Sequence, residues 1–211
     1  MKKLRRSAFP YASLYFISFA SISALRIYQN LYLKRAGLND SQLGTAAAGA
    51  ALMAVVSPLI WGIAADSAAD VRRLASPLFL GAAVTFPAML LTRSYPVLAA
   101  LAVLTSFFYT PLIPLLDALA LGYVSRSGGD YGRVRLWGSL GFIFSTLLFK
   151  AILREGKTSG IGYGLLPVFI YFAALRVLGA GWSFLIPAPE GAERARPRIP
   201  ELRGLLNFNL I

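Results

Sequence analysis

The sequence contains no cysteine and no histidine, and its 21 Lys and Arg residues are balanced by only 9 Asp and Glu residues. Without cysteine, disulfide bonds and thiolate metal sites are excluded. Without histidine, the commonest general base and the commonest metal ligand are missing. We therefore expect no metal ion and no cofactor, and an enzyme is a poor interpretation of this composition.

The shortage of charge also argues against an ordinary soluble domain. Charged residues make up 14% of the chain, compared with about 25% in soluble domains. Hydrophobic residues make up 57%, and the mean hydropathy is +0.63. A net charge of +12 is compatible with a nucleic-acid partner, but nucleic-acid modules are hydrophilic, so no such partner is expected. A basic, apolar chain is typical of a protein in the lipid bilayer whose loops carry Lys and Arg.

Six segments are long and apolar enough to cross a bilayer, for which about 20 residues are needed. They are residues 8–33, 43–65, 74–92, 97–123, 134–153 and 163–186. The pattern predicts an all-α membrane protein in which residues 1–187 form one six-helix bundle. Residues 188–211 are rich in Pro, Arg and Glu and then turn apolar, which indicates a cytoplasmic linker and the start of a further half.

The distribution of Lys and Arg predicts the orientation of the bundle. With the N-terminus inside, 13 of these residues fall on the inner side and 5 on the outer side, so both termini are expected in the cytoplasm. The basic start followed by an apolar run also resembles a secretory signal. The run is longer than the roughly 7–15 residues of a signal core, however, and five more spans follow. We expect a multi-pass protein of the plasma (inner) membrane.

Asp117 is an acidic residue within the fourth predicted span. Such a placement costs about 2.5–3.5 kcal/mol on insertion scales and marks functional residues by default. Pro111 and Pro114 should kink this span and leave the carbonyls near Phe107 and Thr110 without helical donors, available to a cavity. The alternative is that Asp117 lies close enough to the inner end of the span to reach cytoplasmic water.

Two further polar features lie within spans. Arg26, Gln29 and Asn30, with Ser23, fall on one face of the first span and predict the polar wall of a cavity. Arg26 reaching the outer surface is the alternative. Arg176 lies near the middle of the sixth span and needs an anionic partner, either Asp117 or a substrate carboxylate. The arginines at 133 and 135 compete with it for Asp117.

A charged turn joins the second and third spans. Asp66 is expected at the C-terminal end of a helix, where the dipole disfavours an anion, so it should pair with Arg72 or Arg73. Asp70 is suited to cap the next helix, and Gly62 should allow a neighbouring helix to approach closely. The turn is either a gate or merely a charged loop that follows the positive-inside rule.

Several of these segments resemble a known family. The run from Leu33 to Leu38, and the run Pro58-Leu59-Ile60-Trp61-Gly62 with Asp66, Arg72 and Arg73, resemble signatures of the major facilitator superfamily. Pro114–Asp117 and the run from Tyr131 to Ser139 resemble its branch of phenylpropionate, nucleoside and lactose–proton symporters. Ser67 replaces the arginine that usually follows the aspartate of the loop signature.

The resemblance implies a twelve-helix transporter built from two six-helix halves, each a 3+3 inverted repeat, of which this chain is the N-terminal one. It implies proton symport of a small organic solute by alternating access. The expected substrate-binding residues are Arg26, Gln29, Asn30 and Arg176, and the expected proton-coupling residue is Asp117. The expected gate residues are Gly62, Asp66, Arg72, Arg73, Arg133 and Arg135. The partner would be a second half or a second copy. The alternative is a truncated, non-transporting membrane scaffold or assembly partner.

Overall fold

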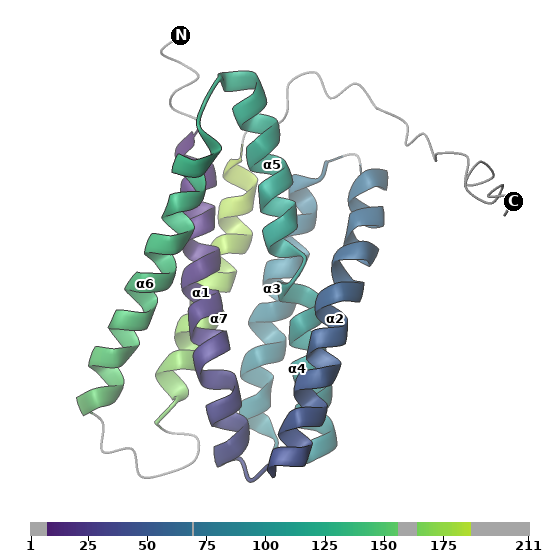
Figure 1. Ribbon diagram of the computed structural model, residues 1–211, viewed down its shortest axis with the longest axis vertical. Helices are drawn as coiled ribbons and strands as arrows, with labels where there is room; N and C mark the ends of the chain where they lie inside the picture. Colours follow the sequence, from purple (N-terminus) through teal and green to yellow (C-terminus); the bar gives the residue numbers. More distant parts are fainter. Residues whose placement is uncertain (1–7, 69, 156–163, 187–211) are drawn as a thin grey trace, which may run out of the picture.

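The computed structural model describes residues 8–68, 70–155 and 164–186, and these ranges contain helices and no strand. In chain order the elements are α1 (Ala8–Arg35), α2 (Asp40–Ser67), α3 (Arg72–Ala88), the 3₁₀ turn η2 (Met89–Leu91), α4 (Tyr95–Tyr109), α5 (Leu112–Ser127), α6 (Tyr131–Glu155), α7 (Leu166–Trp182) and the 3₁₀ turn η3 (Ser183–Leu185). The helices lie roughly parallel to one another in one bundle (Figure 1). The expected linker 188–211 lies outside the described residues.

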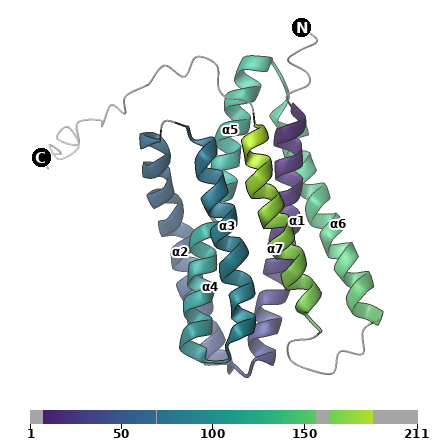
Figure 2. The same cartoon turned by 180° about the vertical axis from the view of Figure 1, so that it is seen from behind.

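Six candidate membrane spans result from these helices, as the sequence predicts. Five are single helices, extended in two cases by a 3₁₀ turn, and the fourth span, Tyr95–Ser127, combines α4 and α5. The first residues of α1 and the last residues of α7 lie at the same end of the bundle, together with the α2–α3 and α5–α6 connections (Figures 1 and 2). This arrangement places the basic connections predicted to be cytoplasmic at one end.

Local signals in the sequence determine where two of the helices begin and end. Asn39 caps α2 in a capping box: its side chain accepts a hydrogen bond from the Gln42 backbone at 2.9 Å, and the Gln42 side chain accepts one from the Asn39 backbone at 3.1 Å. Gly37 precedes this cap with φ of +100°, and Gly128 ends α5 with φ of +64°. Both conformations are unfavourable for other residues, so glycine fixes these two turns.

The fourth span is broken at Thr110 and Pro111, which separate α4 from α5. Proline lacks the N–H that would continue the helix, and its ring clashes with the preceding turn. The predicted kink is therefore confirmed, but the freed carbonyl of Phe107 does not serve a cavity, because it accepts a hydrogen bond from Ser57 Oγ of α2. Ser106 Oγ of α4 in turn donates to the Ala50 carbonyl of α2 at 2.7 Å. These two bonds tie α2 to α4.

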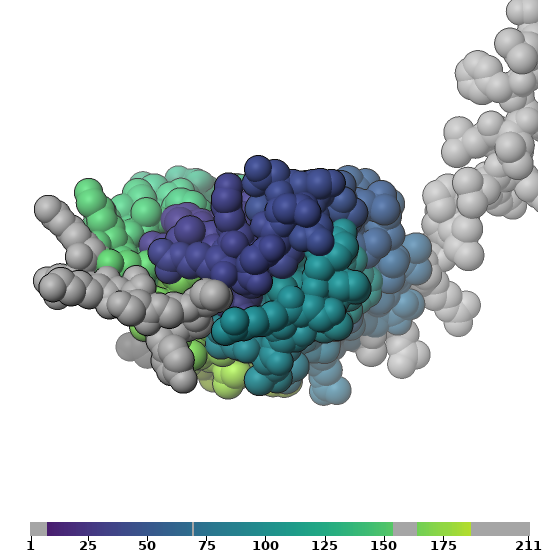
Figure 3. All heavy atoms as spheres, turned by 90° about the horizontal axis from the view of Figure 1, so that it is seen from below, coloured from purple at the N-terminus to yellow at the C-terminus, as the bar shows by residue number. Residues whose placement is uncertain are grey.

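α1 lies at the centre of the bundle, whereas α2 lies at its edge. In the most apolar window of each helix, 67% of α1 is buried and only 11% of α2. α3 and α7 lie behind α1 in Figure 1 and in front of it in Figure 2. Seen along the bundle, α6 and the α2–α3 region lie at opposite ends of an elongated cross-section (Figure 3). The bundle is therefore asymmetric, with helices at both ends that bury little of their surface.

Two clusters of buried apolar side chains fill the bundle. One includes Tyr32, Phe86 and Phe169, and the other includes Tyr15 and Phe79. In the first cluster the Tyr32 hydroxyl also donates to the Met89 carbonyl at 2.8 Å, so a buried phenol occupies an acceptor at the end of α3. Both clusters include side chains of α1, which explains why so much of the surface of α1 is buried.

The close contact of α1 with α6 generates a prediction about stability. A Cβ atom at Gly141 would meet the Phe16 backbone of α1, whereas one at Gly44 would meet nothing within 4 Å. We expect Gly141→Ala to destabilise the bundle by about 1–3 kcal/mol, the usual range for overpacking. Gly44→Ala, the matched control, should leave stability unchanged or raise it slightly. Thermal unfolding in detergent micelles measures both, and equal midpoints would contradict this account of the interface.

Candidate functional site

The side chain of Asp117 connects three helices. It receives hydrogen bonds on Oδ1 from the Tyr15 hydroxyl of α1 at 2.5 Å and from the Tyr131 hydroxyl of α6 at 2.8 Å. Arg135 of α6 binds both of its oxygens through Nη1, at 2.9 and 3.2 Å. We call these four residues the Asp117 cluster. Because its three donors come from α1 and α6, the carboxylate of Asp117 holds α1, α5 and α6 together.

The helices place these side chains by simple spacing. Tyr131 and Arg135 are four residues apart on α6 and so share a face, and the Tyr131 hydroxyl lies 3.2 Å from Arg135 Nη1. Gly138, one turn further along α6, lies against the ring of Phe19, where a Cβ would come within 2.8 Å. The side chain of Asp117 is 28% exposed and that of Arg135 is 45% exposed. The ion pair is therefore open to solvent or solute on one side.

Asp117 thus pairs with Arg135, one of the two competing arginines, and not with Arg176. Arg133 points elsewhere and forms an exposed pair with Asp130, at 3.5 Å. Tyr15 and Tyr131 were missed by the sequence analysis. The spacing of Tyr131 from Arg135 was an available signal, but Tyr15 is 102 residues from Asp117 and no local pattern indicates it.

Arg176 is completely buried, with 0% of its residue surface exposed. Its guanidinium lies over the rings of Phe172 and Phe79, at 4.9 and 5.5 Å from their centroids. None of its three side-chain nitrogens has a hydrogen-bond partner among the described residues. The expected need for an anion is real, but the described part of the chain does not satisfy it.

The predicted polar stripe of α1 is divided. Ser23 is buried and shares a hydrogen bond with Thr146 of α6 at 2.9 Å. Arg26 and Asn30 are exposed, and Gln29 is half-buried. Ser23 therefore attaches one end of the stripe to α6. At the other end, no helix of the described residues covers the side chains of Arg26 and Asn30.

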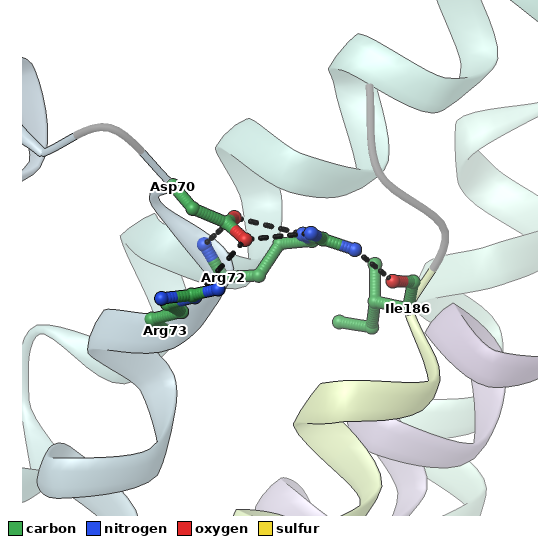
Figure 4. Close-up of polar contacts among 4 residues, drawn as sticks. All are labelled: Asp70, Arg72, Arg73 and Ile186. Carbon is green, nitrogen blue, oxygen red and sulfur yellow. Dashed lines mark hydrogen bonds and ion pairs between the residues drawn. The ribbon is translucent and has the colours of Figure 1, made fainter. Parts of the chain in front are cut away.

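The α2–α3 connection is held by an arginine clamp (Figure 4). Arg72 binds both carboxylate oxygens of Asp70, through Nε at 2.8 Å and Nη2 at 2.6 Å. Its Nη1 donates to the Ile186 carbonyl, just beyond η3, at 2.5 Å. Arg73 lies at 3.6 Å from Asp70 with an exposed side chain. We call Asp70, Arg72 and Ile186 the α3 clamp, because it fastens the start of α3 to the end of the sixth span.

Asp70, not Asp66, is therefore the partner of both arginines. Asp70 also accepts a hydrogen bond from the Arg72 backbone at 3.1 Å, although Val71 occupies the N-cap position itself. The Arg72 guanidinium, which donates to the carboxylate, holds the pKa of Asp70 below its ordinary value of 3.8. A lowered pKa means that the stabilisation is complete above the ordinary value and is lost only as the pH falls through the lowered one.

Asp66 and Gly62 line a groove of about 270 Å³ between α2, α3 and α5. Trp61, Leu78 and Pro111 form part of its apolar walls. Asp66 is exposed and has no ion pair within the described ranges. A Cβ at Gly62 would meet nothing within 4 Å, so the expected close approach of a helix at this glycine is not seen. Among the described residues, no group of three metal-ligating side chains occurs.

The α3 clamp leads to a prediction about two adjacent arginines. Arg72→Gln removes the guanidinium that binds both the partly buried Asp70 carboxylate and the Ile186 carbonyl, so we expect a loss of about 1–3 kcal/mol. Arg73→Gln, the matched control, removes only an exposed contact and should cost little. Urea or thermal unfolding in micelles measures both. Between about pH 5 and 8 the difference should stay constant, because Asp70 remains ionised there; equal losses would show that the clamp contributes nothing.

The sequence is similar to those of known transporters. The maltose permease of Geobacillus stearothermophilus is 32% identical over 96% of this chain and 49% of its own length. A probable 3-phenylpropionic acid transporter of Escherichia coli is 33% identical over 85% of the chain and 46% of its own length. The chain thus spans about half the length of the curated relatives it matches.

Solved structures show the same fold. A crystal structure of the nucleoside transporter NupG superimposes with a TM-score of 0.71 at 18% identity, over 85% of this chain and 44% of that one. The six spans therefore form one half of a major facilitator fold, in an integral multi-pass membrane protein. The sequence matches the MFS_1 like family over residues 9–192, and the chain belongs to that family of transporters.

Proposed function

We propose that the chain is the N-terminal half of a secondary active transporter that moves a small organic solute by proton symport and alternating access. The observation that carries this proposal is the Asp117 cluster. A carboxylate within a membrane span is paired with Arg135 and is reachable from one side. Ionisable groups in such positions are the usual elements of proton relays in transporters.

The Asp117 cluster offers a physical route to coupling. A polar or anionic group of the solute competes with Asp117 for Arg135. In the proposed cycle, the Asp117 carboxylate released from the arginine is the site at which the proton binds. Solute and proton thus bind together, and the coupling is reciprocal because both act on one ion pair. In this role Asp117 is the proton-coupling residue and Arg135 its switchable partner.

Arg26, Gln29 and Asn30 form the polar wall of the solute cavity in this proposal. Arg26 and Asn30 are exposed on a helix that spans the membrane, and contact with lipid at those positions is costly. A second six-helix body, facing this side of the bundle, would enclose them with water and solute. The shared length of only about half of the relatives supports such a partner, either a second half or a second copy.

The inner end of the transporter is closed, we infer, by two sets of charges. The α3 clamp fixes the α2–α3 connection beside the groove that contains Gly62 and Asp66. Arg133 and Arg135 begin α6 at the same end of the bundle. The rival proposal is a non-transporting membrane scaffold, which would need none of these charged groups to move.

Proton-driven uptake tests the proposal. The chain assembled with its second half or second copy and reconstituted in liposomes, with an inward proton gradient, should accumulate labelled maltose, 3-phenylpropionate or uridine, the solute classes named for its relatives. A protonophore should abolish the accumulation. Asp117→Asn should abolish accumulation but retain solute exchange, because a neutral side chain binds no additional proton. Loss of at least tenfold in steady-state accumulation is expected.

The control for this experiment is Asp40→Asn. Asp40 is an exposed aspartate at the start of α2, paired with Lys34 at 3.3 Å, and its replacement should leave accumulation unchanged. If Asp117→Asn still accumulates solute against a gradient, Asp117 is not the coupling residue. If none of the three solutes enters with the unmodified assembly of the chain and its second half or second copy, the scaffold is the better interpretation.

Membrane orientation is a second test. Because the chain has no cysteine, single cysteines can be labelled without background. Ser41→Cys and Ser94→Cys lie at the end of the bundle proposed to be extracellular, and Ser125→Cys at the opposite end. In intact cells a membrane-impermeant maleimide should label the first two, and should label Ser125→Cys only after permeabilisation. Labelling of Ser125→Cys in intact cells would place both termini outside.

A further inference from the structure

Arg176 is the one arginine of the described residues whose side chain is fully buried and without a hydrogen-bond acceptor. It lies on α7, in the interior of the six-helix bundle. Two aromatic faces, those of Phe79 and Phe172, contact its guanidinium. Such contacts offset only part of the cost of burying a cation. An anion at this position would supply the missing stabilisation.

The aspartates of the described residues do not supply that anion. Each lies elsewhere: four are paired with other cations, and Asp66 is exposed in the groove. The pairs are Asp40 with Lys34, Asp70 with Arg72, Asp117 with Arg135 and Asp130 with Arg133. The five hydrogen-bond donors of the Arg176 guanidinium therefore remain unused within the described part of the chain.

Phe79 of α3 and Tyr109 of α4 lie near the guanidinium of Arg176. Gly179, one turn along α7, lies against Phe79, where a Cβ would come within 2.6 Å of the ring. This contact fixes the Phe79 ring beside the guanidinium. Tyr109, which ends α4, lies within electrostatic range of Arg176. The break at Thr110 and Pro111 follows Tyr109 directly in the chain.

We propose that Arg176 anchors a binding site for a small organic monocarboxylate with an apolar body in the interior of the six-helix bundle. The planar guanidinium matches a carboxylate with two parallel hydrogen bonds. One buried cation balances the single negative charge of a monocarboxylate. The rings of Phe79 and Phe172 provide apolar surface for the rest of the solute. This inference rests on the proposed transport function for its biological use, and it identifies the class of solute.

Binding can be tested apart from transport, because Phe79, Phe172 and Tyr109 all belong to this chain. Benzoate is the probe, and benzamide, which has the same shape without the charge, is the matched ligand control. In thermal unfolding of the purified chain in micelles, benzoate should raise the midpoint in a saturable manner. Benzamide should not. The concentration of half-saturation should increase at least tenfold in Arg176→Lys, which loses the planar fork.

Arg176→Met separates a binding role from a packing role. Because it replaces an unpaired buried cation with an apolar side chain, its midpoint without ligand should equal or exceed that of the unmodified chain. Its response to benzoate should be lost. Arg93→Met, at an exposed arginine between η2 and α4, should retain the full response. Failure of transport with a retained benzoate response would refute the proposed function but not this site.

Three results would overturn the site. They are an equal response to benzamide, a benzoate response that persists in Arg176→Met, and no saturable response of the unmodified chain to benzoate at concentrations up to tens of millimolar. Arg176→Met could also lose its benzoate response because it unfolds, which a lower ligand-free midpoint would show. Arg176→Lys then decides, and an unchanged half-saturation in this variant would overturn the site. Arg176→Lys preserves the charge, so its half-saturation reports recognition alone.

Discussion

A segment that crosses a bilayer has to satisfy its polar groups without water, and this constraint governs every helix of the bundle. Hydroxyl groups within the spans bond back to the carbonyl four residues earlier, as Thr85, Thr105 and Thr146 do. Where proline frees a carbonyl, at Phe107, a serine of the neighbouring helix donates to it. The polar atoms thus become the points at which helices are attached to one another.

Charged groups follow the same constraint with different results. Asp117 accepts hydrogen bonds from two tyrosine hydroxyls and an arginine. Asp70 accepts hydrogen bonds from Arg72, which also donates to the Ile186 carbonyl. These groups combine fixed geometry with partial exposure, which suits contacts that are made and broken. Arg176 departs from the pattern, because it is fully buried and lacks an acceptor in the described chain. A departure of this kind is where a missing ligand is best sought.

The sequence predicts the features that depend on local chemistry. Span length and apolarity predict all six spans, Pro111 and Pro114 predict the interruption of the fourth span, and the position of Asp117 within a span marks it as a functional residue. The choice between Arg135 and Arg176 was beyond sequence reasoning, because it depends on how α6 and α7 are rotated about their axes. The helix dipole alone favours Asp66 over Asp70 as the partner of Arg72 or Arg73. The structure favours Asp70, which is two residues from Arg72 and meets its guanidinium at the start of α3.

The break in the fourth span divides the bundle mechanically. α4 is attached to α2 through Ser57 and Ser106, whereas α5 is attached to α1 and α6 through Asp117. Thr110 and Pro111 join these two groups of helices, and α3 packs against both α4 and α5. Because Pro111 lacks a backbone N–H, the hydrogen-bond ladder of the fourth span is interrupted here. The direction of each part of this span is therefore set by different neighbours, α2 for α4 and α1 with α6 for α5.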